Sequence, residues 1–362
     1  MRTPRSRIVF GLVIAAALAV IVIAQLVAGG GGGDDDGGDV QVVSGLVGGE
    51  KVNFLENPEI QKILRDRYKL DIDYTKAGSI EMVRESTTGE DFLWPSNEVA
   101  LALYEERNPG RVKNETIFNS PIVMYSWTPV VAVLMDEGYV TLRDDVYYVD
   151  MERMVELIFS ETPWSDLGLE PFGNVAIIST DPTESNSGNM FYGLLANLLA
   201  GGIATDASIE PVLPQIKTYY ESLGFLEDSS GDLWDNFVKQ GMGAHPIIMG
   251  YESQLIEFSL ANEANRGQIL DQIVIIYPEP TVWSSHPVIA LTDLGEELML
   301  ALQDEEIQRI AWEQHGFRSG LLNINNDPTV LQVARIPSEI TAVISLPRPS
   351  VMEHLIEYLQ RP

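Results

Sequence analysis

The sequence predicts an α/β protein folded into two lobes, and three observations lead to this prediction. First, short apolar runs alternate with segments of helical periodicity from residue 40 onward, which is typical of mostly parallel strands connected by helices. Second, two such alternating units follow one another along the chain. Third, two extended apolar segments, 120–127 and 284–292, stand where a chain would leave a first domain and later return to it.

The first unit has clear helix and strand signals. We expect strands over 40–49, 70–78 and 91–96, and helices over 57–68 and 97–107. Asn57 suits the N-cap of the first helix, and Pro58 suits its first turn. Asn97 is the corresponding N-cap of the second helix. By these bounds, each helix should begin a few residues after the end of a strand.

The second unit and the C-terminal part continue the alternation. We expect a helix over 150–159 and strands over 174–179, 245–251 and 272–278, then helices over 304–316 and 350–362. Asp304 suits an N-cap and Gly316 a C-terminal stop. We expect the last helix to dock on the first lobe through the apolar residues Met352 and Leu355.

These elements predict the domain boundaries. Lobe 1 should comprise residues 40–122 together with 290–362, and lobe 2 should comprise residues 123–289. Each lobe should be a mostly parallel sheet flanked by helices, and the two crossings between the lobes should act as hinges.

The N-terminus has the features of a membrane anchor. Arg2, Arg5 and Arg7 precede 22 uncharged residues, 8–29, which as a helix would span roughly 33 Å. This length favours an uncleaved anchor over a cleavable signal peptide, and the arginines place residues 1–7 in the cytoplasm. Residues 30–39 should be a flexible linker. We therefore expect a single-pass protein of the cell membrane whose soluble part lies outside the cytoplasm, in the periplasm or at the cell surface.

The composition excludes several classes of function. A formal net charge of −30 argues against nucleic-acid binding, and the absence of cysteine excludes disulfides and thiol chemistry. The four histidines, His245, His286, His315 and His354, do not have the spacing of metal ligands. No nucleophile or phosphate-loop motif is present, so we expect no enzyme activity, no cofactor and no metal.

The segment 179–189, "STDPTESNSGN", is unusually rich in hydroxyl and amide side chains. It follows an apolar run and precedes a helix expected over 190–200. Ligands of open α/β sheets bind beyond the carboxyl ends of the strands, and a helix N-terminus there favours an anion. The alternative is an ordinary Ser/Asn-rich turn that only caps the helix.

A resemblance to a known family is carried by the segments "GGEK" (48–51), "KAGS" (76–79), "TDPTESNSGNMF" (180–191), "GMGAHPIIMGYESQLIEF" (241–258), "YPEPTVWSSHPVIAL" (277–291) and "RIAWEQHGFRSG" (309–320), and by the order of elements over roughly residues 40–362. The resemblance is to the type II periplasmic or extracellular solute-binding proteins, the receptors that serve ABC importers. It implies a ligand cleft between two lobes, ABC permease subunits as partners and, in the subgroup that it indicates, no assigned ligand. Neutral donors generally hold tetrahedral oxyanions in this family.

The candidate ligand-binding residues come from both lobes. They are Gly49, Lys51, Ser79, Ser126, Thr183, Ser185, Asn186, Ser187, Gly188, Asn189 and Tyr251. By the resemblance, the loops at 48–51 and 78–79 face the cleft and Tyr251 points into it. Lys51 is equally consistent with a solvent-facing side chain beside Glu50, and Ser126 with packing at the hinge.

The expected function is capture of a small solute, with an inorganic oxyanion such as phosphate or molybdate preferred. A ligand sensor or assembly protein that keeps the fold without transport is the alternative. Glu252 complicates the oxyanion hypothesis, because a buried carboxylate repels an anion and would instead hold an amine. The alternative role for Glu252 is to stabilise the N-terminus of a helix. Arg318 is a candidate charge partner.

Overall fold

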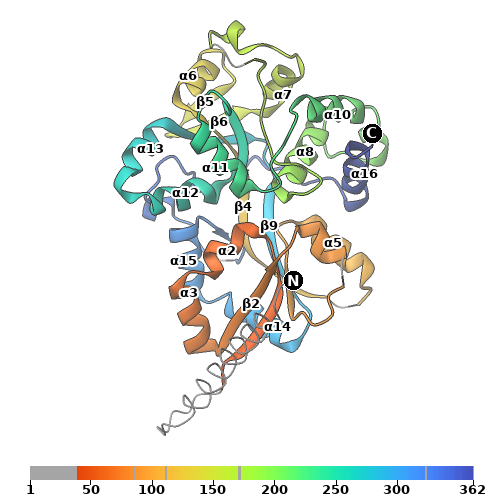
Figure 1. Ribbon diagram of the computed structural model, residues 1–362, viewed down its shortest axis with the longest axis vertical. Helices are drawn as coiled ribbons and strands as arrows, with labels where there is room; N and C mark the ends of the chain where they lie inside the picture. The colour runs from red at the N-terminus through yellow and green to blue at the C-terminus, as the bar shows by residue number, and fades with distance from the viewer. Residues whose placement is uncertain (1–38, 85, 111, 170–172, 323, 362) are drawn as a thin grey trace, which may run out of the picture. The chain divides into compact units, whose positions relative to one another are not determined.

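The computed structural model describes residues 39–361 except 85, 111, 170–172 and 323. The expected anchor and nearly all of the expected linker lie outside the described residues. Within the described part of the chain, no helix is both long enough and apolar enough to cross a membrane. The described residues from Val40 onward form one compact unit (Figure 1).

In the described part of the chain, ten strands form a mixed sheet in the order β2–β1–β3–β9–β4–β8–β6–β5, with β7 and β10 also paired to β4. Their bounds are β1 (Gln41–Val47), β2 (Leu70–Lys76), β3 (Phe92–Trp94), β4 (Lys113–Trp127), β5 (Val140–Arg143), β6 (Val146–Asp150), β7 (Ile247–Tyr251), β8 (Ile273–Glu279), β9 (Trp283–Ala290) and β10 (Arg318–Ser319).

The expectation of mostly parallel sheets was wrong in part. β1 pairs in parallel with β2 and β3, and β6 pairs in parallel with β8, but every pairing of β4 and β9 is antiparallel. The reason is that the chain leaves along β4 and returns along β9 beside it. Residues 113–121 of β4 pair with β9, whereas residues 122–127 pair with β7 and β8, so one strand joins the two halves of the sheet.

The helices cover both halves of the sheet. They are α2 (Val52–Leu55), α3 (Pro58–Ile63), α4 (Ser79–Arg84), α5 (Glu98–Arg107), α6 (Thr128–Asp136), α7 (Met151–Phe159), α8 (Asn186–Leu199), α9 (Asp206–Ile209), α10 (Leu213–Ser222), α11 (Ser230–Gln240), α12 (Glu252–Ala261), α13 (Arg266–Gln272), α14 (Asp293–Ala301), α15 (Glu305–His315) and α16 (Pro349–Leu359). The expected caps form: the side chain of Asn57 accepts from the N–H of Glu59 at 2.9 Å, Asp304 caps α15, and Gly316 ends α15 with φ of 66°.

We refer to β1, β2, β3, α2–α5, α14 and α15 as the first lobe, and to β5–β8 and α6–α13 as the second lobe. β4 and β9 run side by side between these two groups (Figure 1).

The strand expected over 174–179 does not form. Ile178 makes a single parallel bridge to Ile248. The hydroxyl of Tyr219 accepts from the N–H of Ile177 at 3.0 Å and donates to its carbonyl at 2.7 Å. The side chain of Tyr219 therefore takes both hydrogen bonds that a neighbouring strand would otherwise make with Ile177. An apolar run in the sequence does not show that a side chain will replace the strand partner.

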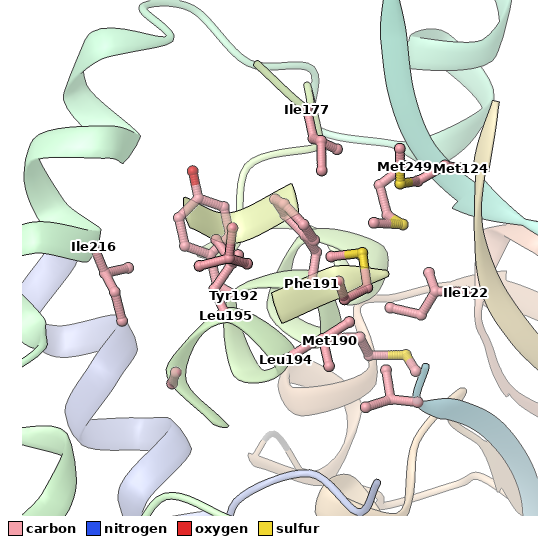
Figure 2. Close-up of a cluster of buried hydrophobic side chains, with 14 of the residues drawn as sticks. Ile122, Met124, Ile177, Met190, Phe191, Tyr192, Leu194, Leu195, Ile216 and Met249 are labelled. Carbon is pink, nitrogen blue, oxygen red and sulfur yellow. The ribbon is translucent and has the colours of Figure 1, made fainter. Parts of the chain in front are cut away.

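α8 is anchored through its apolar residues. Met190, Phe191 and Leu194 are fully buried. Figure 2 shows this helix beside Ile122 of β4 and Met249 of β7, which belong to the same apolar cluster. Because the body of α8 is embedded in the core, its polar N-terminus is held in a fixed place near the strand ends.

α16 forms as expected, and its expected docking on the first lobe accounts for only part of its contacts. It packs against α8, α9 and α10 of the second lobe as well as against α5. Gly193 of α8 makes room for it, since a Cβ atom there would lie 3.0 Å from the sulfur of Met352. Met352 and Leu355 are buried at this contact.

Candidate functional site

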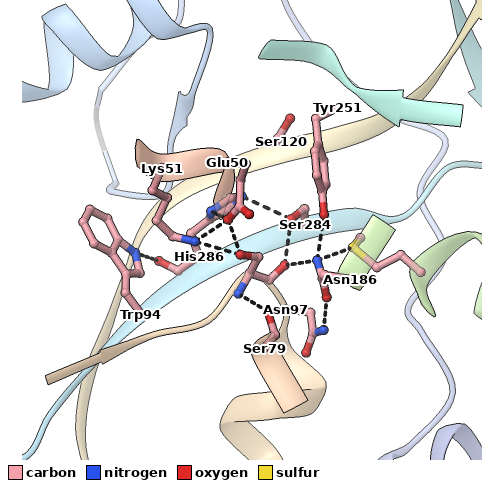
Figure 3. A network of polar contacts seen from close by, with 12 residues as sticks. Glu50, Lys51, Ser79, Trp94, Asn97, Ser120, Asn186, Tyr251, Ser284 and His286 are labelled. Atoms are coloured by element: carbon pink, nitrogen blue, oxygen red, sulfur yellow. Dashed lines mark hydrogen bonds and ion pairs between the residues drawn. The ribbon is translucent and has the colours of Figure 1, made fainter. Parts of the chain in front are cut away.

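A network of buried polar groups lies where the two lobes meet (Figure 3). The N-terminal ends of α5, α8 and α12 contribute to it, together with the turn at residues 48–51 and two side chains of β9. The turn at 48–51, α5 and α12 each follow a strand, and β9 is itself a strand, so the sheet determines where most of these polar groups lie.

The N-terminus of α8 presents the polar stretch that the sequence indicated. Ser187 is 1% exposed, and its hydroxyl lies 2.8 Å from that of Thr180 and 3.2 Å from that of Ser185. The N–H groups of residues 186–188 have no hydrogen-bond acceptor among the described residues. The first N–H groups of a helix have no acceptor within the helix, and an anion can provide one.

Gly188 holds this helix start close to the preceding turn. A Cβ atom at Gly188 would collide with the carbonyl oxygen of Thr180 and lie 2.9 Å from that of Asp181. Asp181 in turn accepts from the N–H and the hydroxyl of Thr183, both at 2.8 Å. The hydroxyl of Thr183 therefore stabilises the turn and does not belong to the polar network.

The side chain of Asn186 connects the two lobes. Its Nδ2 donates to the hydroxyl of Tyr251 at 2.9 Å and to the carbonyl of Ser96 at 3.1 Å, and its Oδ1 accepts from Nδ2 of Asn97. Ser284 of β9 donates to the same carbonyl of Ser96 at 2.7 Å.

A charged cluster lies on the first-lobe side of the network. Nζ of Lys51 donates to the hydroxyl of Ser96 at 2.7 Å and to Oε1 of Glu50, and Ser96 donates to the same carboxylate oxygen. Nδ1 of His286 lies 3.5 Å from Oε1 of Glu50. Lys51 and His286 are fully buried, so the solvent-facing alternative for Lys51 was wrong.

The environment fixes the charges of this cluster. Burial would raise the pKa of Glu50, but the charge of Lys51 and the hydrogen bonds from Lys51 and Ser96 lower it to about 2. Burial and the charge of Lys51 lower the pKa of His286 to about 3, so His286 is neutral at pH 7. Burial also lowers the pKa of Lys51, against the attraction of Glu50. The cluster is thus a compensated pair beside a neutral imidazole.

Tyr251 is a neutral hydroxyl in the same network. Burial, followed by the negative charge of Glu50, raises the pKa of Tyr251. Its side chain is 2% exposed and enters from the start of α12.

The structure brings some of the candidate residues together and leaves others apart. Those in or beside the network are Lys51, Ser79, Ser185, Asn186, Ser187, Gly188 and Tyr251. Gly49 is exposed, and a Cβ atom there would meet nothing within 4 Å. Ser126 donates to the carbonyl of Pro246 at 2.8 Å, which is packing between strands. Asn189 is buried, and its Oδ1 has no partner among the described residues.

Sequence reasoning did not choose Glu50, Ser96, Asn97, Ser284 or His286 as site residues. Glu50 was considered only as a neighbour of Lys51, Asn97 only as a helix cap, and Ser284 only as part of a crossing. The available signal was positional, because each of them lies at the end of a strand or on the returning crossing. Asn97 has two roles: its Oδ1 accepts from the N–H of Ala100 at 2.7 Å and its Nδ2 reaches Asn186.

Glu252 belongs to a separate, satisfied ion pair. Arg318 donates from Nε at 2.7 Å and from NH2 at 2.9 Å to its two carboxylate oxygens, and Tyr277 donates to one of them at 2.6 Å. Glu252 is fully buried and Arg318 is 4% exposed. The carboxylate is compensated within the protein, so it does not require an amine ligand.

The chain has the two-lobed fold of the type II solute-binding proteins of ABC transporters, as the resemblance implied. No protein-family model matches the chain, and no curated protein matches its sequence. Solved structures match it closely enough to identify this fold. A proposed extracellular solute-binding protein from Bordetella parapertussis has a TM-score of 0.58 at 12% identity and covers 88% of this chain and 97% of its own.

Two other solved structures show how different the ligands of this fold are. The sulfate-binding protein SubI of Mycobacterium tuberculosis has a TM-score of 0.51 at 16% identity, with 86% of this chain and 96% of its own covered. The apo ferric ion-binding protein A of Pasteurella haemolytica has a TM-score of 0.53 at 12% identity, with 88% and 96% covered. The fold is therefore shared by proteins named for an anion and for a cation, and the ligand has to be inferred from the site itself.

Proposed function

We propose that this protein is an extracytoplasmic solute-binding protein that holds a small oxyanion between its lobes and delivers it to the permease of an ABC importer. A membrane anchor at residues 8–29 would keep it at the cell surface or in the periplasm. The proposal contains no catalytic step.

The observation that carries the proposal is the buried start of α8. Among the described residues, three consecutive N–H groups, at 186–188, have no acceptor, and beside them the hydroxyl of Ser187 lies within hydrogen-bonding distance of those of Thr180 and Ser185. A fixed set of neutral donors at a helix N-terminus binds a small anion without a cationic partner.

The carboxylate of Glu50 limits which oxyanions can bind in this network. Its Oε1 takes all the contacts with Lys51, Ser96 and His286, while Oε2 has no hydrogen-bond partner among the described residues. A ligand that reaches this carboxylate has to present a donor to it, since two negative oxygens repel each other. The network therefore favours an oxyanion that still carries a proton, or carries a hydroxyl, over a fully deprotonated one.

The alternative is a sensor that uses the same site and passes its signal to a regulatory partner. Interlobe binding supports both functions equally, because the distinction depends on the partner. A genetic test separates them: loss of the importer's permease abolishes uptake if this protein serves transport.

A thermal-shift screen of the purified full chain tests the proposed ligand class. We expect phosphate-like oxyanions to raise the melting temperature progressively with the logarithm of their concentration, by an amount equivalent to about 2.7 kcal/mol at a ligand concentration 100 times Kd. Ser187→Ala should weaken this stabilisation. The matched control is Ser126→Ala, which also removes the hydroxyl of a buried serine but should leave the stabilisation unchanged. Stabilisation by amines, sugars or peptides alone would refute the oxyanion proposal.

A further inference from the structure

Both polar atoms of the Asn186 amide are hydrogen-bonded within the protein itself. Oδ1 accepts from Asn97, and Nδ2 donates to the carbonyl of Ser96 and to the hydroxyl of Tyr251. Nδ2 also approaches the sulfur of Met190 at 3.3 Å. An amide has two donor hydrogens and a carbonyl oxygen, so little capacity remains for a ligand.

The orientation of this amide is determined from both ends. Asn97 Oδ1 accepts from the N–H of Ala100, so the group that Asn97 offers to Asn186 is its Nδ2 donor. The carbonyl of Ser96 can only accept, so the group that Asn186 offers to it is a donor. Both conditions require the same orientation of Asn186, and no flip of either amide satisfies all partners.

These bonds join the two lobes directly. Asn186 is the first residue of α8, which packs in the second lobe, whereas Ser96 and Asn97 connect β3 to α5 in the first lobe. Figure 3 shows Asn186 between Tyr251 and Asn97, beside the dashed contacts that lead to Ser284. The contacts need only protein atoms, and they join the lobes in the arrangement that the structure shows.

We propose that Asn186 and Asn97 form a latch that favours the closed arrangement of the lobes before any ligand is present, and that Asn186 is a positioning residue and not a ligand contact. This inference rests on the proposed function, because it describes how the same site closes. The latch sets the fraction of binding-competent protein, and the apparent Kd equals the intrinsic Kd divided by that fraction. Its loss should therefore weaken binding without changing which ligand is selected.

Two substitutions remove the latch with little change in shape. Asn186→Asp keeps the oxygen that accepts from Asn97 but places a second oxygen against the carbonyl of Ser96. Asn97→Asp keeps the oxygen that caps α5 but loses the donor to Asn186. Asn325→Asp is the matched control, because it makes the same charge change at an exposed position outside the network.

The lack of cysteine in the chain makes a distance measurement straightforward. Spin labels at Asp66→Cys in the first lobe and Glu221→Cys in the second lobe use side chains that are 63% and 61% exposed. Pulsed electron spin resonance then reports the distribution of interlobe distances in the ligand-free full chain. We expect Asn186→Asp and Asn97→Asp each to lower the closed-to-open ratio about tenfold, and Asn325→Asp to leave it unchanged.

The outcomes separate the latch from the proposed function. Ser187→Ala should weaken oxyanion binding without changing the ligand-free distances, whereas Asn186→Asp should change both and raise the apparent Kd by up to about tenfold. Unchanged ligand-free distances in Asn186→Asp and Asn97→Asp, or a wild-type protein that is already open without ligand, would overturn the latch. Because the distances are measured without ligand, failure to bind any oxyanion would refute the proposed function and leave the latch result intact.

Discussion

The pair formed by Glu252 and Arg318 gives the sharpest structural prediction, because Glu252 was the residue that most threatened the oxyanion hypothesis. Replacing Arg318 with Met removes two donors at 2.7 and 2.9 Å from a carboxylate that is fully buried. The hydroxyl of Tyr277, at 2.6 Å, is the contact that remains. The variant therefore buries a negative charge that is only partly compensated.

The expected cost follows from this geometry. Removing one partner of a buried ion pair typically costs about 3–5 kcal/mol, because the desolvation of the other partner is no longer offset. Since the hydrogen bond from Tyr277 persists, we expect a value near the lower end, about 3 kcal/mol. Arg318 also donates to the carbonyl oxygens of Pro337 at 2.7 Å and Ser338 at 3.1 Å, so their loss adds to the cost.

Urea unfolding monitored by circular dichroism measures this cost. With a slope of about 3 kcal/mol/M, the midpoint of Arg318→Met should fall by about 1 M. The double variant Glu252→Gln/Arg318→Met should be more stable than Arg318→Met alone, because the uncompensated charge has been removed. A cost below about 1 kcal/mol, or a double variant whose losses simply add, would contradict a structural role for Glu252.

Two further predictions concern the polar network and the start of α8. The pKa of His286 is lowered from 6.5 to about 3, so below pH 6.5 the unfolded chain binds a proton that the folded protein excludes, and stability is lost as the pH falls. Between pH 7 and pH 5 the free energy of unfolding of the wild type should therefore fall by about 2 kcal/mol more than that of His286→Gln. Urea unfolding at each pH measures this difference, and an equal pH dependence in both proteins would contradict a neutral buried imidazole. Gly188→Ala should displace α8 from the carbonyl of Thr180 and abolish oxyanion-induced stabilisation in a thermal-shift assay. Unimpaired binding would show that this close approach is not needed.

Local signals allowed much of the fold to be predicted. The caps at Asn57, Asn97 and Asp304 mark where helices begin, and these helices form with those caps. The α/β alternation and the crossing at 120–127 also correspond to elements of the structure. Each of these features depends on residues that are near one another in the sequence.

The features that could not be predicted depend on distant partners. The hydroxyl of Tyr219 occupies the backbone of Ile177, so a segment with the pattern of a strand does not form one. α16 docks on α8 because Gly193 leaves space for Met352, a complementarity that no periodicity reveals. The antiparallel pairing of β4 and β9 likewise follows from how the two crossings meet.

The candidate site was predicted unevenly for the same reason. Ser187 and Tyr251 were chosen from their positions near strand ends, and both lie in the polar network. Thr183 shares the same polar stretch, but its hydroxyl serves Asp181. Glu50 and Asn97 were not chosen, because their roles depend on atoms of Ser96 and Asn186 that only the folded chain brings within reach.

Isothermal titration calorimetry of phosphate into the purified full chain tests the central claim most directly. The proposed function predicts saturable one-site binding that Ser187→Ala weakens by about ten- to a hundredfold, the effect of losing a hydrogen bond to a charged group, and that Ser126→Ala leaves unchanged. Binding that is the same in the wild type and Ser187→Ala, or heat of binding with amines or sugars but with no oxyanion, would contradict it.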